Sequence, residues 1–272
     1  MIKNIEKIEK YYYPADLSKN RKPGVSAICR CKNEEEFCIP SILSVKDFFD
    51  EIIVILNNCT DKTPILLNAL KLPNMKIFYY DEDIIEAGPR KVDISDLSTK
   101  SIVYYTNYCI SLSSYEWIYR WDLDNIALSN FNDLRNIINK NELNWVEDRA
   151  FDIVNDSWIG SQQMVSFEKR LIRIKDNVRY ISSPNRYAEQ AYIPGIGMRI
   201  EKPTFFHMRW SVSNPGKYWP NNWMEIPHFR DIYNRHIPII PYSGEFPKIL
   251  IKYNQLNKDP YKLIELYHNG LI

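Results

Sequence analysis

Two aspartates, Asp122 and Asp124, stand two residues apart directly after the apolar segment 116–121. The segment has the composition of a β-strand, and in extended backbone two residues so spaced point to the same side. Neighbouring carboxylates repel each other unless a cation lies between them, and their oxygens suit a hard divalent ion that also binds phosphate. The pair therefore indicates either a metal site or a solvated strand end, because Asp-x-Asp is frequent by chance.

Alternating strands and helices precede this pair and must position it. The expected strands are 25–29, 51–56, 76–80 and 116–121, and the expected helices are 34–49, one N-capped by Thr63, and 99–112. Such alternation predicts an α/β fold with a mostly parallel sheet flanked by helices. In open sheets of this kind ligands bind beyond the carboxyl ends of the strands. We therefore expect Asn33, Asn57 and the two aspartates to converge at one edge.

Composition narrows the class of protein. The 272 residues include 35 Lys and Arg against 34 Asp and Glu, so the formal net charge is +1 and no bulk attraction for nucleic acid is expected. With 45% hydrophobic residues the chain is globular. It contains no run near the ~20 apolar residues that a membrane-spanning helix needs, and its N-terminus lacks the apolar segment of a secretory signal peptide. We expect a cytoplasmic protein, with peripheral membrane association left open.

All five cysteines lie in the first half of the chain, and their number is odd. A chain of this length can build a core without disulfides, which favours reduced thiols. Cys29 and Cys31 are too close in sequence for a zinc knuckle and have no second pair downstream. We therefore expect buried thiols.

Several segments, taken in order, resemble the family 2 glycosyltransferases of the GT-A fold across roughly residues 25–128. The segments that carry the resemblance are Val25–Ile28 with Asn33–Glu35, Phe49–Thr63, Tyr104–Asn107 with Tyr115–Ile118, and Trp121–Asp124. The resemblance implies that 25–128 form the nucleotide-sugar-binding half of a GT-A domain, after an N-terminal leader of residues 1–24. Residues 129–272 would then form the acceptor-binding half and a C-terminal extension.

The same resemblance implies which residues hold the donor. Arg30, Asn33, Asn57 and Asp122 would contact the nucleotide, and Asp122 and Asp124 would hold Mn²⁺ or Mg²⁺ on its diphosphate. A divalent ion there would stabilise the charge that develops as the nucleoside diphosphate leaves.

Two positions depart from the family pattern. Leu56 and Asn57 stand where many members carry aspartates, so the base contact would come from an amide. Thr106 replaces an arginine common in such enzymes, which leaves Lys100 or Arg90 to meet the phosphates.

His207 is a further candidate metal ligand, because enzymes of this type often draw a late histidine from beyond the core. It closes the apolar run Pro203–Met208. Imidazole readily joins two carboxylates on a manganese-like ion. A hydrogen-bonded core histidine is the alternative reading.

A transferase that inverts the anomeric carbon needs a base for the acceptor hydroxyl. Glu189 is the first candidate, because the run 168–173 followed by Glu189 resembles lipopolysaccharide-core transferases. The alternative is that Glu189 is a surface carboxylate paired with Arg186 and has no catalytic role. Asp148 is the reserve, although Glu147 and Asp148 also read as a solvated strand end.

The segment 209–223 is rich in aromatic residues, which could bind the sugar acceptor or only pack against the rest of the fold; they are Trp210, Tyr218, Trp219 and Trp223.

The sequence thus predicts a metal-dependent, inverting hexosyltransferase that moves a sugar from a nucleotide sugar, expected to be a UDP-sugar, to a hydroxyl of a glycan, lipid-linked glycan or protein. The alternative is a catalytically inactive GT-A-like protein that binds nucleotide sugar or glycan.

Overall fold

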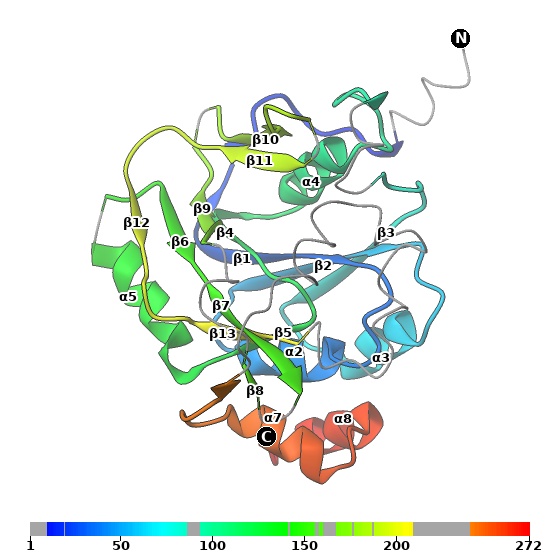
Figure 1. The fold of residues 1–272 in the computed structure, drawn as a ribbon. Helices are drawn as coiled ribbons and strands as arrows, with labels where there is room; N and C mark the ends of the chain where they lie inside the picture. The colour runs from blue at the N-terminus through cyan, green and yellow to red at the C-terminus, as the bar shows by residue number, and fades with distance from the viewer. Residues whose placement is uncertain are drawn as a thin grey trace.

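The structure is a computed structural model that describes residues 10–272 except 19, 86–92, 141, 156–157, 160–166, 176, 187 and 209–239. A seven-stranded sheet runs through its centre (Figure 1). In spatial order its strands are β12 (Gly197–Arg199), β6 (Trp145–Asp148), β9 (Glu168–Arg173), β4 (Tyr115–Arg120), β1 (Lys22–Cys31), β2 (Glu51–Asn57) and β3 (Met75–Tyr80). Strands β4, β1, β2 and β3 are mutually parallel, and β9 runs antiparallel to β4 and β6.

Helices cover both faces of the parallel strands. Helix α4 (Ile102–Ser111) lies on one face, and α2 (Cys38–Val45) and α3 (Thr63–Leu70) lie on the other (Figure 1). The order and type of these elements confirm the expected α/β class with a mostly parallel sheet flanked by helices. Strand β2 is buried along its whole length, as a strand covered on both faces must be.

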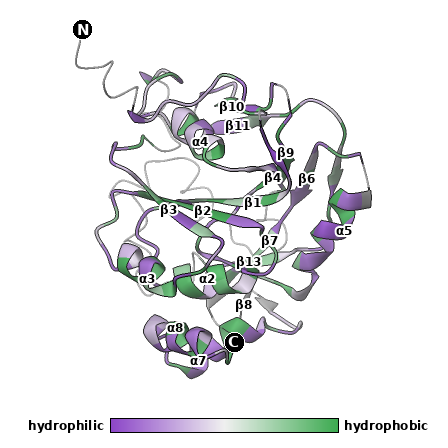
Figure 2. Cartoon of the chain, turned by 180° about the vertical axis from the view of Figure 1, so that it is seen from behind, coloured by the Kyte–Doolittle hydropathy of each residue, from purple (hydrophilic) through white to green (hydrophobic). Residues whose placement is uncertain are grey.

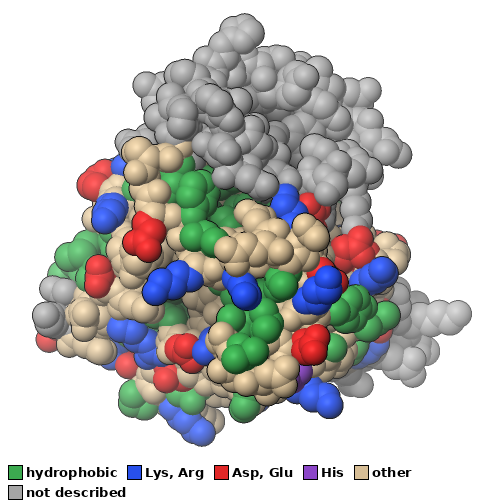
Figure 3. Space-filling view, turned by 90° about the horizontal axis from the view of Figure 1, so that it is seen from below, with side chains coloured by type: hydrophobic (Ala, Val, Ile, Leu, Met, Phe, Trp, Pro, Cys, Tyr) green, Lys and Arg blue, Asp and Glu red, His purple; other side chains and the backbone are tan. Residues whose placement is uncertain are grey.

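A C-terminal extension adds a further layer. Helices α7 (Lys248–Gln255) and α8 (Pro260–His268) pack against α2, and α8 also contacts α3. Helix α2 therefore lies between the sheet and the extension, which explains why seven of its eight residues are buried. Figure 2 shows α2 as mainly hydrophobic, whereas α7 and α8 carry both kinds of residue. On the face seen from below, acidic and basic side chains are interspersed (Figure 3).

Segments that follow the four parallel strands in the chain form a second sheet of five strands. Its spatial order is β14 (Ile240–Pro241), β8 (Trp158–Ile159), β7 (Ala150–Asn155), β13 (Phe205–His207) and β5 (Asn125–Ala127). A hairpin of β10 (Arg179–Ser182) and β11 (Glu189–Tyr192) lies beside α4. The 3₁₀ turn Ser129–Asn132 and α5 (Asp133–Lys140) connect β5 to β6.

The aspartate pair differs from its sequence prediction. Strand β4 ends at Arg120, so the two aspartates lie in the turn after the strand and the two-residue periodicity of a strand does not apply to them. Trp121 still donates its backbone N–H to the Ile28 carbonyl of β1 at 3.1 Å, and its buried indole N–H donates to Ser41 Oγ at 2.9 Å. The chain then turns, with the Asn125 N–H bonded to the Asp122 carbonyl.

The start of α3 also differs. Lys62, not Thr63, is the N-cap residue. The Thr63 hydroxyl accepts a hydrogen bond from the Glu34 N–H at 2.8 Å, and Asp61 accepts from the Thr63 N–H at 3.0 Å. The Thr63 hydroxyl thus joins two loops instead of capping its own helix.

Candidate functional site

Asp122 and Asp124 follow β4 at the carboxyl edge of the sheet and have different partners. Asp122 Oδ2 lies 2.9 Å from Arg170 Nη1, and Asp124 Oδ2 lies 3.3 Å from His207 Nε2. Burial alone would raise the pKa of Asp122, but the charges of Arg170, Arg120 and Arg30 hold it well below its usual range. Asp122 is therefore an ionised carboxylate at any physiological pH.

His207 is held between two carboxylates. Strand β13 pairs with β5 and with β7, which sets His207 opposite Asn125 on one side and Asp152 on the other. Its Nδ1 lies 2.7 Å from Asp152 Oδ1, while Nε2 faces Asp124. Burial lowers the pKa of His207, yet the two aspartates together raise it to about 10. With its pKa raised this far, the metal-free ring carries a proton on each nitrogen and pairs with both aspartates, so a metal would bind Nε2 only by displacing the proton that faces Asp124.

Asp124 Oδ2 and His207 Nε2, 3.3 Å apart, contact each other directly as an ion pair. Adjacent ligands around an octahedral ion bonded at about 2.1 Å are also separated by ~3 Å, so this distance fits an ion pair and a pair of metal ligands equally well. No group of three His, Cys, Asp or Glu side chains with metal-site geometry occurs among the described residues. The chain thus offers two adjacent ligands, and the other positions would fall to Asp122 after rearrangement, to substrate oxygens or to water.

Three arginines and two glutamates join this edge to the neighbouring strands. Arg170 Nη2 lies 3.0 Å from Glu168, and Arg120 is also paired with Glu168. Arg30 Nη1 donates to Glu189 at 2.8 Å, and Arg120 Nη1 lies 3.9 Å from the same carboxylate. The five charged groups therefore form one partly buried network that continues through Arg170 to Asp122.

Parts of this edge lack hydrogen-bond partners. Among the described residues, Nε of Arg30, Nε of Arg120 and both polar side-chain atoms of Asn125 are buried and unbonded. Buried polar groups in native proteins are nearly always paired, so unpaired ones need an explanation, and a bound ligand is one. Two such atoms, the Nε atoms of Arg30 and Arg120, belong to the charged network and mark it as the candidate site.

The two candidate bases have different environments. The Glu189 side chain is 10% exposed; burial would raise its pKa, but Arg30 and Arg120 hold the pKa below its usual range. Asp148 is 1% exposed and accepts hydrogen bonds from Tyr119 at 2.5 Å and Thr204 at 2.9 Å. Burial raises the pKa of Asp148 to about 6. Glu189 belongs to the arginine network, and Asp148 contacts core residues.

Asn33 lies in the loop that follows β1, and Asn57 is the last residue of β2. Asn33 Oδ1 accepts from the Thr60 N–H at 2.7 Å. Asn57 donates from its amide nitrogen to the carbonyls of Tyr80 at 2.8 Å and Glu82 at 2.7 Å. Both asparagines therefore shape the loops at the edge, and the orientation of the Asn57 amide is fixed, because a carbonyl can accept only from the NH₂ group.

Other predicted residues lie apart or outside the described chain. Thr106 Oγ1 accepts from Arg30 at 2.7 Å, so Arg30 occupies the space near this position. Lys100 is exposed just before α4, and Glu147 pairs with Arg199 at 2.9 Å. The remaining candidates lie outside the described residues: Arg90, Trp210, Tyr218, Trp219 and Trp223.

Sequence reasoning missed Asp152, Arg120 and Asn125. Arg120 directly precedes Trp121 in the strand that leads to the aspartates, and a charged residue in an apolar run was its available signal. Asp152 and Asn125 meet His207 only through strand pairing across a long stretch of sequence. No local spacing could have found them.

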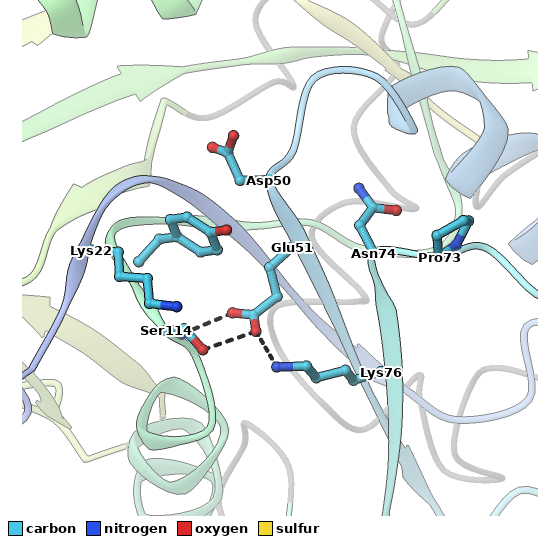
Figure 4. A pocket seen from close by; sticks show the side chains of 8 residues that line it. Lys22, Asp50, Glu51, Pro73, Asn74, Lys76 and Ser114 are labelled. Atoms are coloured by element: carbon cyan, nitrogen blue, oxygen red, sulfur yellow. Dashed lines mark hydrogen bonds and ion pairs between the residues drawn. The ribbon is translucent and has the colours of Figure 1, made fainter.

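A surface hollow at the opposite, amino end of the strands offers a contrast. It has a volume of about 170 Å³ and is lined by Lys22, Asp50, Glu51, Pro73, Asn74, Lys76, Ser114 and Tyr115 (Figure 4). Glu51 accepts hydrogen bonds from Ser26, Ser114 and Lys76, the last at 2.6 Å. None of the buried unbonded atoms of the described chain belongs to this lining. Its polar groups stabilise the fold and give no sign of a ligand.

No protein-family model and no curated protein sequence matches the chain. Solved structures are similar at low identity. S. aureus TarS, residues 1–349, is 14% identical with a TM-score of 0.45, over 68% of this chain and 60% of that chain. Glucosyl-3-phosphoglycerate synthase from Mycobacterium tuberculosis, in complex with Mg²⁺ and UDP, is 20% identical with a TM-score of 0.33, over 50% and 46%.

A third similar structure is 4-diphosphocytidyl-2C-methyl-D-erythritol synthase from Anaerococcus prevotii, at 12% identity and a TM-score of 0.31, over 89% of this chain and 98% of that chain. The chain thus spans less than two thirds of the first two proteins. Similarities this distant do not establish an activity, which must come from the site itself. Within the described part of the chain, no helix has both the length and the apolar character needed to cross a membrane.

Proposed function

We propose that the chain is a GT-A-type glycosyltransferase that transfers a hexosyl group from a nucleotide sugar to a hydroxyl acceptor with inversion. The observation that carries the proposal is the array Asp124–His207–Asp152, next to a buried arginine network at the carboxyl edge of a parallel sheet. Family 2 glycosyltransferases, which the segments from Val25 to Asp124 resemble, use this edge for the donor.

Asp124 and His207 would hold Mn²⁺ or Mg²⁺, with Asp122 near the ribose or the same ion. Such an ion, when bound, supplies positive charge that stabilises the leaving diphosphate. Asp152 fixes the ring of His207. Arg30 and Arg120 carry buried N–H groups without partners among the described residues, and a phosphate oxygen would satisfy them.

Asn57 supports a uridine nucleotide. Both hydrogens of its amide nitrogen are committed to the carbonyls of Tyr80 and Glu82, so only its Oδ1 remains for a base. Uracil offers an N–H at the position where cytosine offers an unprotonated nitrogen. Because Asn57 Oδ1 can only accept a hydrogen bond, it favours the uracil of UDP-sugars over the cytosine of CDP-sugars.

Glu189 is our proposed general base, with Asp148 in reserve. Its carboxylate is ionised and lies in the arginine network near the donor side of the site. The acceptor would be a glycan, a lipid-linked glycan or a protein hydroxyl, and the segment 209–223, outside the described residues, is our candidate for its platform.

Calorimetry tests the proposal most directly. UDP should bind the unaltered chain in the presence of Mn²⁺ and lose most of its affinity with a chelator, and CDP should bind more weakly than UDP. Equal binding with and without metal would overturn the metal assignment. Equal binding of CDP would overturn the role of Asn57.

A second candidate, a non-catalytic binder of nucleotide sugar, is favoured by one observation. Arg30 and Arg120 lower the pKa of Glu189 and so weaken it as a base. The discriminating measurement is release of UDP from UDP-sugars over hours, by hydrolysis or by transfer. Release that needs the protein and the metal supports the transferase; metal-dependent binding without release supports the binder.

A further inference from the structure

Three cysteine thiols gather beneath the loops that follow β1 and β2. Cys31 and Cys38 belong to the core between the sheet and α2, and Cys59, in the loop after β2, packs against the same core. All five cysteines are free thiols, and Cys59 is the one that is partly exposed; the other four are buried. Four of the five thiols are buried as expected, whereas the partly exposed Cys59 differs from that expectation and is the accessible one.

Cys59 is in direct contact with Cys31. Its Sγ lies 3.6 Å from the Cys31 carbonyl oxygen, and the Asn33 N–H donates to the same Sγ at 3.5 Å. A hydrogen bond from the Cys31 thiol is the largest cause that lowers the pKa of Cys59, to about 7. Burial raises the pKa of Cys31, which therefore stays protonated. Cys59 is therefore the more readily ionised of the two thiols, and its thiolate beside the Cys31 thiol would supply the two forms that disulfide formation requires.

The backbone around the pair is already closed. The Thr60 N–H bonds Asn33, the Lys62 N–H bonds Glu35 at 3.0 Å, and the Glu34 N–H bonds Thr63. These bonds join the loop after β1 to the loop after β2 on either side of the cysteines. The two sulfurs are therefore held near each other without a covalent link, which favours reaction within the pair over reaction with other thiols.

We propose that Cys59 and Cys31 form an oxidisable pair, in which a peroxide converts the two thiols to a disulfide. The Cys59 thiolate attacks one peroxide oxygen, so an S–O bond forms, the O–O bond breaks and hydroxide leaves. The Cys31 sulfur then displaces the sulfenic oxygen: the S–S bond forms, the S–O bond breaks, and water leaves with the Cys31 proton. The two thiols lose two electrons and the peroxide becomes two waters. The proposal does not depend on the transferase function.

Peptide mapping after oxidation tests the pair. The reduced full-length chain is treated under native conditions with hydrogen peroxide, the remaining thiols are blocked with N-ethylmaleimide, and the protein is digested with trypsin without reduction. Trypsin cuts after Arg30, Lys32, Lys46 and Lys62, which leaves Cys29, Cys31, Cys38 and Cys59 on four separate peptides. We expect a disulfide-linked peptide that joins Cys31 to Cys59 and disappears on reduction. A link from Cys59 to Cys38, or oxidation of Cys59 to sulfinic acid without a link, would overturn the proposal.

Two variants sharpen the result. Cys59→Ser should abolish the linked peptide and the loss of two hydrogen masses. Cys109→Ser, which removes a buried thiol on α4, should leave both intact. Alkylation of Cys59 by iodoacetamide should also accelerate as pH rises through about 7, because the thiolate is the nucleophile. Equal alkylation of Cys59 and the buried cysteines in the folded protein would contradict the selectivity on which the pair depends.

Discussion

The two ends of the parallel strands bury charge in different ways. At the amino end, Glu51 is 4% exposed, yet serine donors and the Lys76 ammonium surround its carboxylate. At the carboxyl end, Arg30 and Arg120 are paired with carboxylates but keep buried N–H groups that have no partner among the described residues. A completed set of hydrogen bonds stabilises a fold, whereas an incomplete one costs stability and is retained where a ligand completes it.

This contrast predicts that substitutions at the two ends have separable effects. At the carboxyl end, ligand binding and turnover should fall while the free energy of unfolding changes little. At the amino end, the free energy of unfolding should fall while ligand binding is unchanged.

Asp124→Asn should have the largest effect at the carboxyl end. The amide keeps the shape of the side chain but is a far poorer ligand for a divalent ion than a carboxylate. We expect metal-dependent UDP binding to be abolished, as measured by calorimetry with Mn²⁺. Asp47→Asn is the matched control, because that side chain is 86% exposed. Retained Mn²⁺-dependent affinity in the Asp124 variant would remove this aspartate from the metal site.

Glu189→Gln should separate binding from turnover. A glutamine cannot accept the proton of the acceptor hydroxyl, so transfer should fall by a factor on the order of 10² to 10⁴. UDP and Mn²⁺ affinity, measured in parallel, should stay within a few-fold of the unaltered protein. A fall in turnover of only a few-fold would move the base to Asp148, whose Asn substitution would then show the same separation.

The fold was predictable because its parallel strands are short, mainly apolar segments separated by helices, and β2 is apolar from Ile52 to Leu56. The run Glu51–Leu56 reads only as a buried strand, and the structure has β2 there with one residue more. The paired aspartates were visible by type, but the turn that carries them was not, because the strand ends at Arg120 and the Asn125 N–H bonds back to the Asp122 carbonyl. Local periodicity does not show where a strand gives way to such a turn.

The role of His207 was also beyond what local sequence can show, because its neighbours are distant in sequence. His207 was a candidate by its position after an apolar run, and a core histidine was the alternative. Its two carboxylate neighbours are Asp124, in the turn between β4 and β5, and Asp152, in β7. The pairing of β13 with β5 and β7 in the second sheet brings them together. Since neither partner lies near it in sequence, the distinction between ligand and core residue required the strand pairing.

Asp148→Asn tests a buried carboxylate that lies beside the site. Burial raises the pKa of Asp148 to about 6, against the charge of Arg170 and the hydrogen bonds of Tyr119 and Thr204. A carboxylate with a raised pKa binds more protons when folded, so stability falls as pH rises from about 4 through 6, by roughly 3 kcal/mol from this group. Urea unfolding across that range should show a flatter pH dependence in the variant. An unchanged slope would show that Asp148 titrates normally.

Glu51→Gln is the smallest expected effect and the direct test of the amino end. The glutamine keeps one acceptor oxygen but loses the charge that Ser26, Ser114 and Lys76 bind, which should lower the free energy of unfolding by about 1–3 kcal/mol in urea titrations. Lys76→Gln is the matched control: Lys76 is half-exposed, so its loss should cost less than about 1 kcal/mol. Both variants should bind UDP and Mn²⁺ as the unaltered protein does. Loss of nucleotide affinity in Glu51→Gln at full folding would contradict the division, because it would tie the hollow at the amino end to the site at the carboxyl end.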